Sequence, residues 1–194
     1  MAMPPRIRRG LTALLVVLAL VAAVVVVREL RQAQSATAAQ TIDRTRQVLP
    51  ANRRPVFPVL DGTGLDGKPL STAPLRGDVL VVNFWGSWCS PCRKEAAVLE
   101  RVAQEDAARG VRFVGVDVRD STTAGRAFET AHGITYPSFD DPAGLVALRL
   151  GALGPQATPS TYVVDRHGKL AAVFFGATVY DELHSAVELV LEKG

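Results

Sequence analysis

Residues 79–92 read Val79-Leu80-Val81-Val82-Asn83-Phe84-Trp85-Gly86-Ser87-Trp88-Cys89-Ser90-Pro91-Cys92. The first half, up to Trp85, is short, β-branched and aromatic, which is typical of a buried strand. Beyond Cys92, apolar residues recur at intervals of three and four, as on one face of a helix. The pattern therefore predicts a strand, a turn and a helix, with Cys89 at the helix N-terminus and Cys92 in its first turn.

These two cysteines are the only ones in the 194-residue chain. A disulfide between them would close a very small loop, and such a cross-link removes little entropy from the unfolded chain. We therefore interpret the pair as a dithiol that opens and closes during a reaction. Free N–H groups and the positive end of the helix dipole stabilise a thiolate at a helix N-terminus. Cys89 is thus the expected nucleophile, and Cys92 is the thiol that resolves a mixed disulfide.

Two other interpretations of the cysteines are a structural zinc site and a pair of inert thiols. A structural zinc site normally needs four Cys or His ligands at recognisable spacing. The histidines His132, His167 and His184 are instead scattered singly along the chain, and each is expected at the surface or at the end of an element. A redox-active pair is favoured, and no metal site or cofactor is predicted.

The stretch from Val81 to Cys92, with Arg93-Lys94-Glu95 after it, resembles the membrane-tethered thioredoxin-like proteins of the TlpA/ResA/DsbE group. A second match is Ala157-Thr158-Pro159-Ser160-Thr161-Tyr162-Val163-Val164-Asp165, followed by Gly168. The resemblance covers residues 55–192. It implies a thioredoxin fold in which Pro159 is a cis-proline facing the dithiol and Thr158 offers its backbone to the substrate chain. An ordinary trans proline is the alternative, since cis X–Pro bonds are uncommon. Trp88, next to Cys89, is expected either to wall the substrate site or to serve packing.

Asn83 stands where thioredoxins proper carry a buried aspartate, six residues before the first cysteine. Asparagine cannot accept a proton at neutral pH. Glu95 is the candidate replacement, because it follows Cys92 by three positions on the same helix face, and a glutamate there is typical of the group that the chain resembles. Glu95 is therefore predicted to exchange a proton with the cysteine pair and to tune its pKa values. The alternative is a solvated first-turn glutamate that complements the helix dipole.

Strand-like and helix-like segments alternate through the rest of the chain. We expect a hairpin around Asp61-Gly62 to Gly67, between the apolar residues 56–60 and 65–70, followed by a strand at 111–117. A helix is expected over 122–132, capped by Ser121 or Thr122 and ended by Gly133. After it we expect a short helix at 142–150, a hairpin of 160–164 and 170–175, and a closing helix over 180–191. This order predicts an α/β, thioredoxin-like fold with a mixed central sheet flanked by helices and an N-terminal β-hairpin extension.

Residues 11–27 form an apolar stretch that follows Arg6, Arg8 and Arg9. With Gly10 it would make about 27 Å of helix, close to the hydrocarbon thickness of a bilayer. A single uncleaved transmembrane helix is favoured over a cleaved signal peptide, because the small-x-small triplet Ala36-Thr37-Ala38 lies far beyond the apolar stretch. The arginine bias favours a cytoplasmic N-terminus. The catalytic domain then lies on the extracytoplasmic side, where a functional disulfide persists more readily.

The predicted organisation is a cytoplasmic tail at 1–10, an anchor or signal segment at 11–27, a linker at 28–54 and a thioredoxin-like domain at 55–194. The net charge of +3 is divided unevenly, because residues 1–54 carry nine arginines and two acidic residues. The remainder is therefore at −4, and the basic excess fits attraction to an anionic membrane surface. No nucleic-acid partner is predicted, since the folded domain has no basic excess.

Together these features predict an extracytoplasmic thiol–disulfide oxidoreductase that acts on protein dithiols or disulfides. A separate redox partner, such as a membrane electron transporter, would recharge the dithiol. The resemblance favours a protein disulfide reductase and suggests apocytochrome c as a substrate, whereas an oxidative protein-folding catalyst is the alternative, since the motif does not fix the redox poise. A copper-binding module and a peroxidase are further alternatives. Sequence neighbours of the cysteines include no His or Met, and Gly86 stands where peroxiredoxins carry a threonine.

Overall fold

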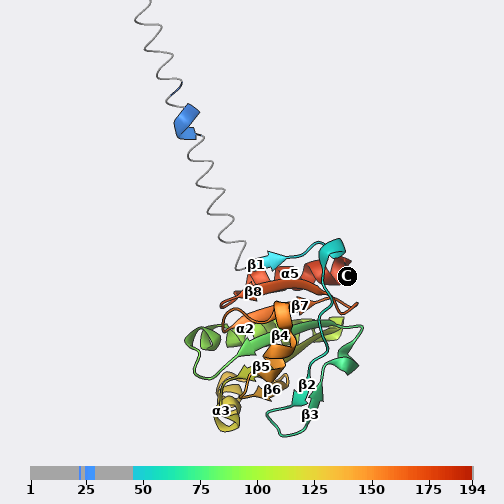
Figure 1. The fold of residues 1–194 in the computed structure, drawn as a ribbon, viewed down its shortest axis with the longest axis vertical. Helices are drawn as coiled ribbons and strands as arrows, with labels where there is room; N and C mark the ends of the chain where they lie inside the picture. Colours follow the sequence, from blue (N-terminus) through green and yellow to red (C-terminus); the bar gives the residue numbers. More distant parts are fainter. Residues whose placement is uncertain (1–21, 23–24, 29–45, 194) are drawn as a thin grey trace, which may run out of the picture. The chain divides into compact units, whose positions relative to one another are not determined.

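The computed structural model describes residues 22, 25–28 and 46–193 (Figure 1). The predicted tail at 1–10, most of the predicted anchor at 11–27 and residues 29–45 of the predicted linker lie outside the described residues. Among the described residues, none of the helices is both long and apolar enough to cross a bilayer. The chain divides into two units, Met1–Arg44 and Thr45–Gly194, and both cysteines belong to the second.

The second unit is built on a six-stranded mixed sheet. Its strands are β1 (Arg46–Val48), β4 (Val79–Trp85), β5 (Val111–Val118), β6 (Ser138–Asp141), β7 (Ser160–Val164) and β8 (Leu170–Phe175). They lie in the order β1-β8-β7-β4-β5-β6, which Figure 1 shows from top to bottom. The pairings of β5 with β4 and β6 are parallel, and those that join β4, β7, β8 and β1 are antiparallel. The predicted thioredoxin-like mixed sheet is confirmed.

Strand β4 lies inside the sheet, and all seven of its residues are buried. Because side chains alternate along a strand, Val79 and Val81 face one side, where they pack with apolar residues of α2 (Ser90–Asp106) and α5 (Tyr180–Lys193). On the same side Trp85 stacks on Phe128 of α3 (Thr122–His132), with ring centroids 4.6 Å apart. The other side packs against Val146 of α4 (Leu145–Arg149). The sheet is thus covered by helices on both faces.

Several predicted elements have the bounds that the sequence indicates. Helix α3 begins after Ser121, whose hydroxyl accepts from the Ala124 N–H at 3.2 Å, and it ends at Gly133, which has the left-handed φ of 65°. Strands β7 and β8 match the predicted hairpin. Helix α4 is shorter than the predicted 142–150, because the Asp141 carboxylate accepts from the Val146 and Ala147 N–H groups and fixes the helix start there.

The N-terminal hairpin is confirmed, but its strands are displaced from the predicted segments. They are β2 (Asp61–Thr63) and β3 (Pro69–Ser71), with register from Asp61↔Ser71 to Thr63↔Pro69. The apolar stretch 56–60 is not a hairpin strand. Phe57 and Leu60 are buried in the core on the α4 side of the sheet, and Val56 makes only an isolated bridge to Lys169. Phe57 and Leu60 are therefore apolar because they pack in the core, and not because they form a hairpin strand.

The folded unit also begins earlier than the predicted boundary at 55. Strand β1 lies within the predicted linker at 28–54 and pairs antiparallel with β8, from Arg46↔Phe174 to Val48↔Ala172. All three β1 residues are exposed at the sheet edge. Because an exposed edge strand carries polar residues, its sequence resembles that of a tether. Further along, Arg54 forms an ion pair with Asp165 at 3.0 Å, and both side chains are buried.

Candidate active site

Cys89 stands at the junction between β4 and α2. Helix α2 begins at Ser90, and Cys89 is its N-cap residue, with extended backbone. The Cys92 backbone N–H donates to Cys89 Sγ across 3.2 Å. Pro91 lies in the first turn, where its missing N–H removes no intrahelical bond. The predicted strand, turn and helix are therefore confirmed, and the helix N-terminus points a donor at the nucleophilic sulfur.

The two cysteines are joined by a disulfide, with their Cα atoms 5.3 Å apart. Both are nearly buried, at 3% and 2% exposed. Cys89 Sγ lies 3.5 Å from the carbonyl oxygen of Thr158. The Thr158–Pro159 peptide bond is cis, in agreement with the expectation from the resemblance. The fold thus brings the second sequence motif, from the start of β7, directly against the redox pair.

Trp88 projects beside the dithiol and is 52% exposed. Its indole Nε1–H donates to the Val118 carbonyl at 3.2 Å, which holds the ring over the end of β5. Gly86 makes room for this ring, because a Cβ added at Gly86 would stand 2.5 Å from the indole Nε1. A threonine at this position would collide with Trp88.

Asp120 holds the active-site turn in place. Its Oδ2 accepts from the Ser87 N–H at 2.6 Å, while the Arg93 guanidinium donates to the Ser87 carbonyl at 2.7 Å. Asp120 is not among the residues that the sequence motifs indicate. A signal was present, because a carboxylate two residues after β5 lies at the same end of the sheet as the turn after β4, with which β5 is parallel.

Glu95 lies in the helix behind the cysteines and is 1% exposed. Its Oε1 accepts from the Asn83 side-chain amide at 2.9 Å, and its Oε2 accepts from the Thr178 backbone N–H at 2.9 Å. The Asn83 amide also donates to the Thr161 hydroxyl at 3.0 Å. This burial excludes the alternative of a solvated glutamate. Sequence reasoning missed Thr178, which acts through its backbone and so leaves no side-chain signal.

The surroundings of Glu95 change its acidity. Burial raises the pKa of Glu95 to about 7, against the hydrogen bonds from Thr178 and Asn83, which lower it. Both donors are neutral, so no cation fixes the carboxylate in its charged form. The group is therefore able to gain and lose a proton near neutral pH, as the position of a proton-exchanging residue requires.

Asp117 is a second buried carboxyl near the site, and the sequence analysis did not identify it. It is fully buried in β5, and neither of its carboxylate oxygens has a hydrogen-bond partner among the described residues. Burial raises the pKa of Asp117 to about 8, and the neighbouring carboxylates Asp120, Asp140 and Glu129 act in the same direction. Asp117 therefore also titrates near neutrality, and pH experiments on Glu95 need to account for it.

Known proteins are similar to this chain in sequence and in fold. A family model described as the AhpC/TSA family matches residues 54–173. The thiol-disulfide oxidoreductase ResA of Bacillus subtilis is 30% identical over 132 residues, which cover 68% of this chain and 71% of that protein.

Two solved structures from Corynebacterium are similar. A DsbF homologue from Corynebacterium diphtheriae has 32% identity and a TM-score of 0.71, covering 75% of this chain and 92% of that chain. A secreted thiol-disulfide isomerase from Corynebacterium glutamicum has 28% identity and a TM-score of 0.72, covering 77% and 93%. The chain therefore belongs to the AhpC/TSA family, as a thiol–disulfide oxidoreductase of the ResA/DsbE type with Cys89 and Cys92 as its CxxC pair.

Proposed function

We propose that the protein is a protein disulfide reductase that works outside the cytoplasm. The observation that carries this proposal is Glu95, a buried carboxyl behind the dithiol whose pKa is raised to about 7 by burial. The organisation proposed with it is a cytoplasmic tail at 1–10, a transmembrane anchor at 11–27 and a linker up to residue 44. A relative described as secreted supports the extracytoplasmic location.

In the first step, the Cys89 thiolate attacks one sulfur of a partner's disulfide. A bond forms between Cys89 Sγ and that sulfur, the partner's S–S bond breaks, and its other sulfur leaves as a thiolate. The Cys92 N–H and the α2 N-terminus favour the attacking thiolate, because they place positive partial charge beside Cys89 Sγ. The product is a mixed disulfide between Cys89 and the partner.

In the second step, the Cys92 thiol gives its proton to the Glu95 carboxylate and attacks Cys89 Sγ. The Cys89–Cys92 disulfide forms, the mixed disulfide breaks, and the partner's remaining sulfur leaves as a thiolate that takes up a proton. Two electrons have then passed from the dithiol to the partner. A separate dithiol donor recharges the pair by the reverse exchange, and a membrane electron transporter is the proposed source of these electrons.

Glu95 also bears on the direction of electron flow. Pairs whose thiolate is strongly stabilised are oxidants, because their reduced form is favoured. A negative charge on Glu95 disfavours a thiolate at Cys92 and so opposes that effect. This supports reduction over the alternative of oxidative protein folding. The alternative keeps some support, since one structural relative is described as a disulfide isomerase.

The proposed substrate is an extended protein segment around a disulfide, with apocytochrome c before haem attachment as the candidate. Thr158 would pair its backbone with this segment, beside the cis-Pro159, while Trp88 walls the site. The position of the Thr158 carbonyl, 3.5 Å from Cys89 Sγ, supports this role, because a chain bound there would bring its sulfur to the nucleophile.

Trapping tests the proposal. In cells, Cys92→Ala should leave partners attached to Cys89, because the second step is lost, and the adducts can be identified by mass spectrometry. The double variant Cys89→Ala/Cys92→Ala is the matched control and should trap nothing. Adducts with apocytochromes would support the proposed role, whereas adducts with many secreted proteins would favour the folding catalyst. If no Cys89-linked adduct formed, the exchange mechanism would be wrong.

The reduction potential of the dithiol tests the direction. A reductase should have a potential near that of thioredoxin, about −270 mV, whereas a folding oxidant should approach the value of DsbA, about −120 mV. Equilibration of the full chain with glutathione or thioredoxin buffers, followed by thiol alkylation, gives this value. A potential above about −180 mV, the level of protein disulfide isomerase, would contradict a reductase.

A further inference from the structure

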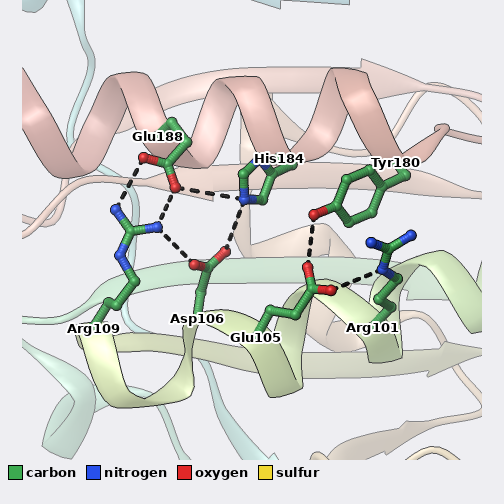
Figure 2. A network of polar contacts seen from close by, with 7 residues as sticks. All are labelled: Arg101, Glu105, Asp106, Arg109, Tyr180, His184 and Glu188. Atoms are coloured by element: carbon green, nitrogen blue, oxygen red, sulfur yellow. Dashed lines mark hydrogen bonds and ion pairs between the residues drawn. The ribbon is translucent and has the colours of Figure 1, made fainter.

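Far from the dithiol, the end of α2 meets the middle of α5 in a polar cluster (Figure 2). Asp106 is the last residue of α2, and His184 and Glu188 lie one turn apart on α5. One ligand atom from each of these three side chains lies within 4.8 Å of the others. Asp106 is distant in the sequence from His184 and Glu188, so the spacing along the chain does not bring the three residues together.

Asp106 carries an unsatisfied oxygen into this cluster. Asp106 is 2% exposed, and its Oδ1 accepts from the Arg109 guanidinium at 2.8 Å. Its Oδ2 is buried and has no hydrogen-bond partner among the described residues. Buried polar atoms are normally partnered, because an unpartnered one has lost its water without compensation. The open oxygen lies 4.0 Å from His184 Nε2, and Figure 2 shows the imidazole pointing towards both carboxylates.

We propose that Asp106, His184 and Glu188 bind one divalent transition-metal ion, of which zinc fits best. The imidazole nitrogen favours zinc over calcium or magnesium, which prefer oxygen ligands alone. Zinc bonds to nitrogen and oxygen are about 2.0 Å long, so donors in a tetrahedral site lie roughly 3.3 Å apart. His184 Nε2 lies 3.5 Å from Glu188 Oε1 and 4.0 Å from Asp106 Oδ2. Small side-chain movements close these gaps.

Surrounding groups orient the three ligands. Arg109 donates to both Glu188 oxygens as well as to Asp106, and so holds the two carboxylates side by side. Tyr180 stacks on the His184 ring with centroids 5.1 Å apart and nearly parallel planes. Metal sites commonly have such outer contacts, which fix the ligand geometry. His184 and Glu188 are about one-third exposed, which leaves an entry path and room for water as a fourth ligand.

The charge balance suits a divalent cation. Two carboxylates and one guanidinium leave one negative charge, to which a neutral imidazole adds nothing. His184 Nε2 faces the Asp106 and Glu188 carboxylates, and Arg109 donates to both of these carboxylates (Figure 2).

Calorimetric titration with zinc chloride tests the site. The full chain is used in detergent without a histidine tag, and the Cys89–Cys92 disulfide is kept intact so that free thiols do not compete. We expect one zinc ion per chain and a rise in Tm of roughly 5 °C or more at a hundredfold excess over Kd. His184→Gln should weaken binding at least tenfold, whereas the control His167→Gln, an exposed histidine elsewhere, should not change it.

A second variant, Asp106→Asn, distinguishes zinc bound by the three residues together from zinc bound by His184 alone. It should also weaken zinc binding at least tenfold, and Co²⁺ bound to the unsubstituted protein should show the visible absorption of a low-coordinate site. Circular dichroism checks that both variants remain folded. The proposal is overturned if the unsubstituted protein binds no zinc, or if folded His184→Gln or Asp106→Asn binds zinc as tightly as the unsubstituted protein does.

Discussion

Helix α2 carries a buried carboxylate near each end, and the two lie in different surroundings. Glu95, behind the dithiol, is hydrogen-bonded by the neutral Asn83 amide and the Thr178 N–H. Asp106, at the opposite end, faces the Arg109 guanidinium and the His184 imidazole. Both are almost fully buried. The comparison teaches that burial alone does not decide the role of a carboxylate: neutral donors leave its proton free to exchange, whereas charged neighbours suit it to holding a cation.

The largest expected effect is on the pH dependence of stability. The folded pKa of Glu95, about 7, lies above its unfolded value of 4.5. Folding therefore favours the protonated form of Glu95. Its contribution to the free energy of unfolding is complete below pH 4.5 and is lost as the pH rises to about 7. The loss amounts to about 3 kcal/mol. In Glu95→Gln this loss should be absent, so the variant should gain stability relative to the unsubstituted protein over that range.

Urea unfolding of the oxidised proteins at a series of pH values measures this difference. Asp117 titrates in an overlapping range, but it does so in both proteins and cancels in the comparison. The matched control is Glu192→Gln, an exposed glutamate on α5. The difference in stability between Glu95→Gln and the unsubstituted protein should grow from pH 4.5 to 7. If it stays constant over this range, Glu95 does not have a raised pKa, and the contrast drawn between the two ends of α2 is wrong.

The second effect is on the resolution of the mixed disulfide. If Glu95 accepts the Cys92 proton, Glu95→Gln should slow the second step roughly 100-fold at pH 7. The first step, attack by Cys89, should change much less. Stopped-flow kinetics with a disulfide peptide separates the two steps, and Glu192→Gln should match the unsubstituted protein. Equal slowing of both steps would mean that Glu95 acts by holding the turn and not by moving a proton.

The third effect tests the neutral donors directly. Removing the Asn83 amide by Asn83→Ala takes away a hydrogen bond to the charged form of Glu95, so the pKa of Glu95 should rise by about one unit. In Asn83→Ala, the loss of stability with rising pH should then continue to about pH 8 instead of ending near pH 7. The exposed Asn52→Ala is the control. An unchanged profile would show that this hydrogen bond does not tune Glu95.

The smallest effect is expected at the other end of α2. Without zinc, the half-buried His184 has long contacts with Glu188 at 3.5 Å and Asp106 at 4.0 Å and stacks on Tyr180, and partly exposed charged contacts of this kind contribute at most about 1 kcal/mol. His184→Gln should therefore change the metal-free free energy of unfolding by less than this amount in chelator-treated protein. A much larger loss would show that the cluster is an ion-pair network required by the fold, and the contrast with Glu95 would need another explanation.

The sequence predicts the active-site turn and the β7–β8 hairpin because local patterns decide them. Apolar residues dominate β4 and end β7, and the residues from Gly86 to Cys92 carry a specific motif. The surroundings of Glu95 were predicted only in part. Glu95 was identified from its helical spacing, but its partner Thr178 is a backbone donor from a distant loop, and only the folded chain brings them together.

The errors share a physical cause. Strand β1 is polar because it lies at an exposed edge, so its sequence does not differ from a linker. Residues 56–60 are apolar because they cover the sheet, and this pattern is also that of a strand. In each case the deciding interaction lies between segments that no local pattern connects.

The direction of β1 decides at which end of the sheet the preceding chain enters the domain. Arg46, where the described chain enters the sheet, lies beside Phe174, and Gly176, two residues further on, donates to the Pro159 carbonyl. The preceding chain therefore joins the domain at the edge of the end that carries the dithiol, three strand spacings or about 14 Å across the sheet from β4. A bulky group fused directly before Arg46 would therefore stand at the end of the domain that carries the dithiol, whereas one fused after the last turn of α5 would not share that entry point.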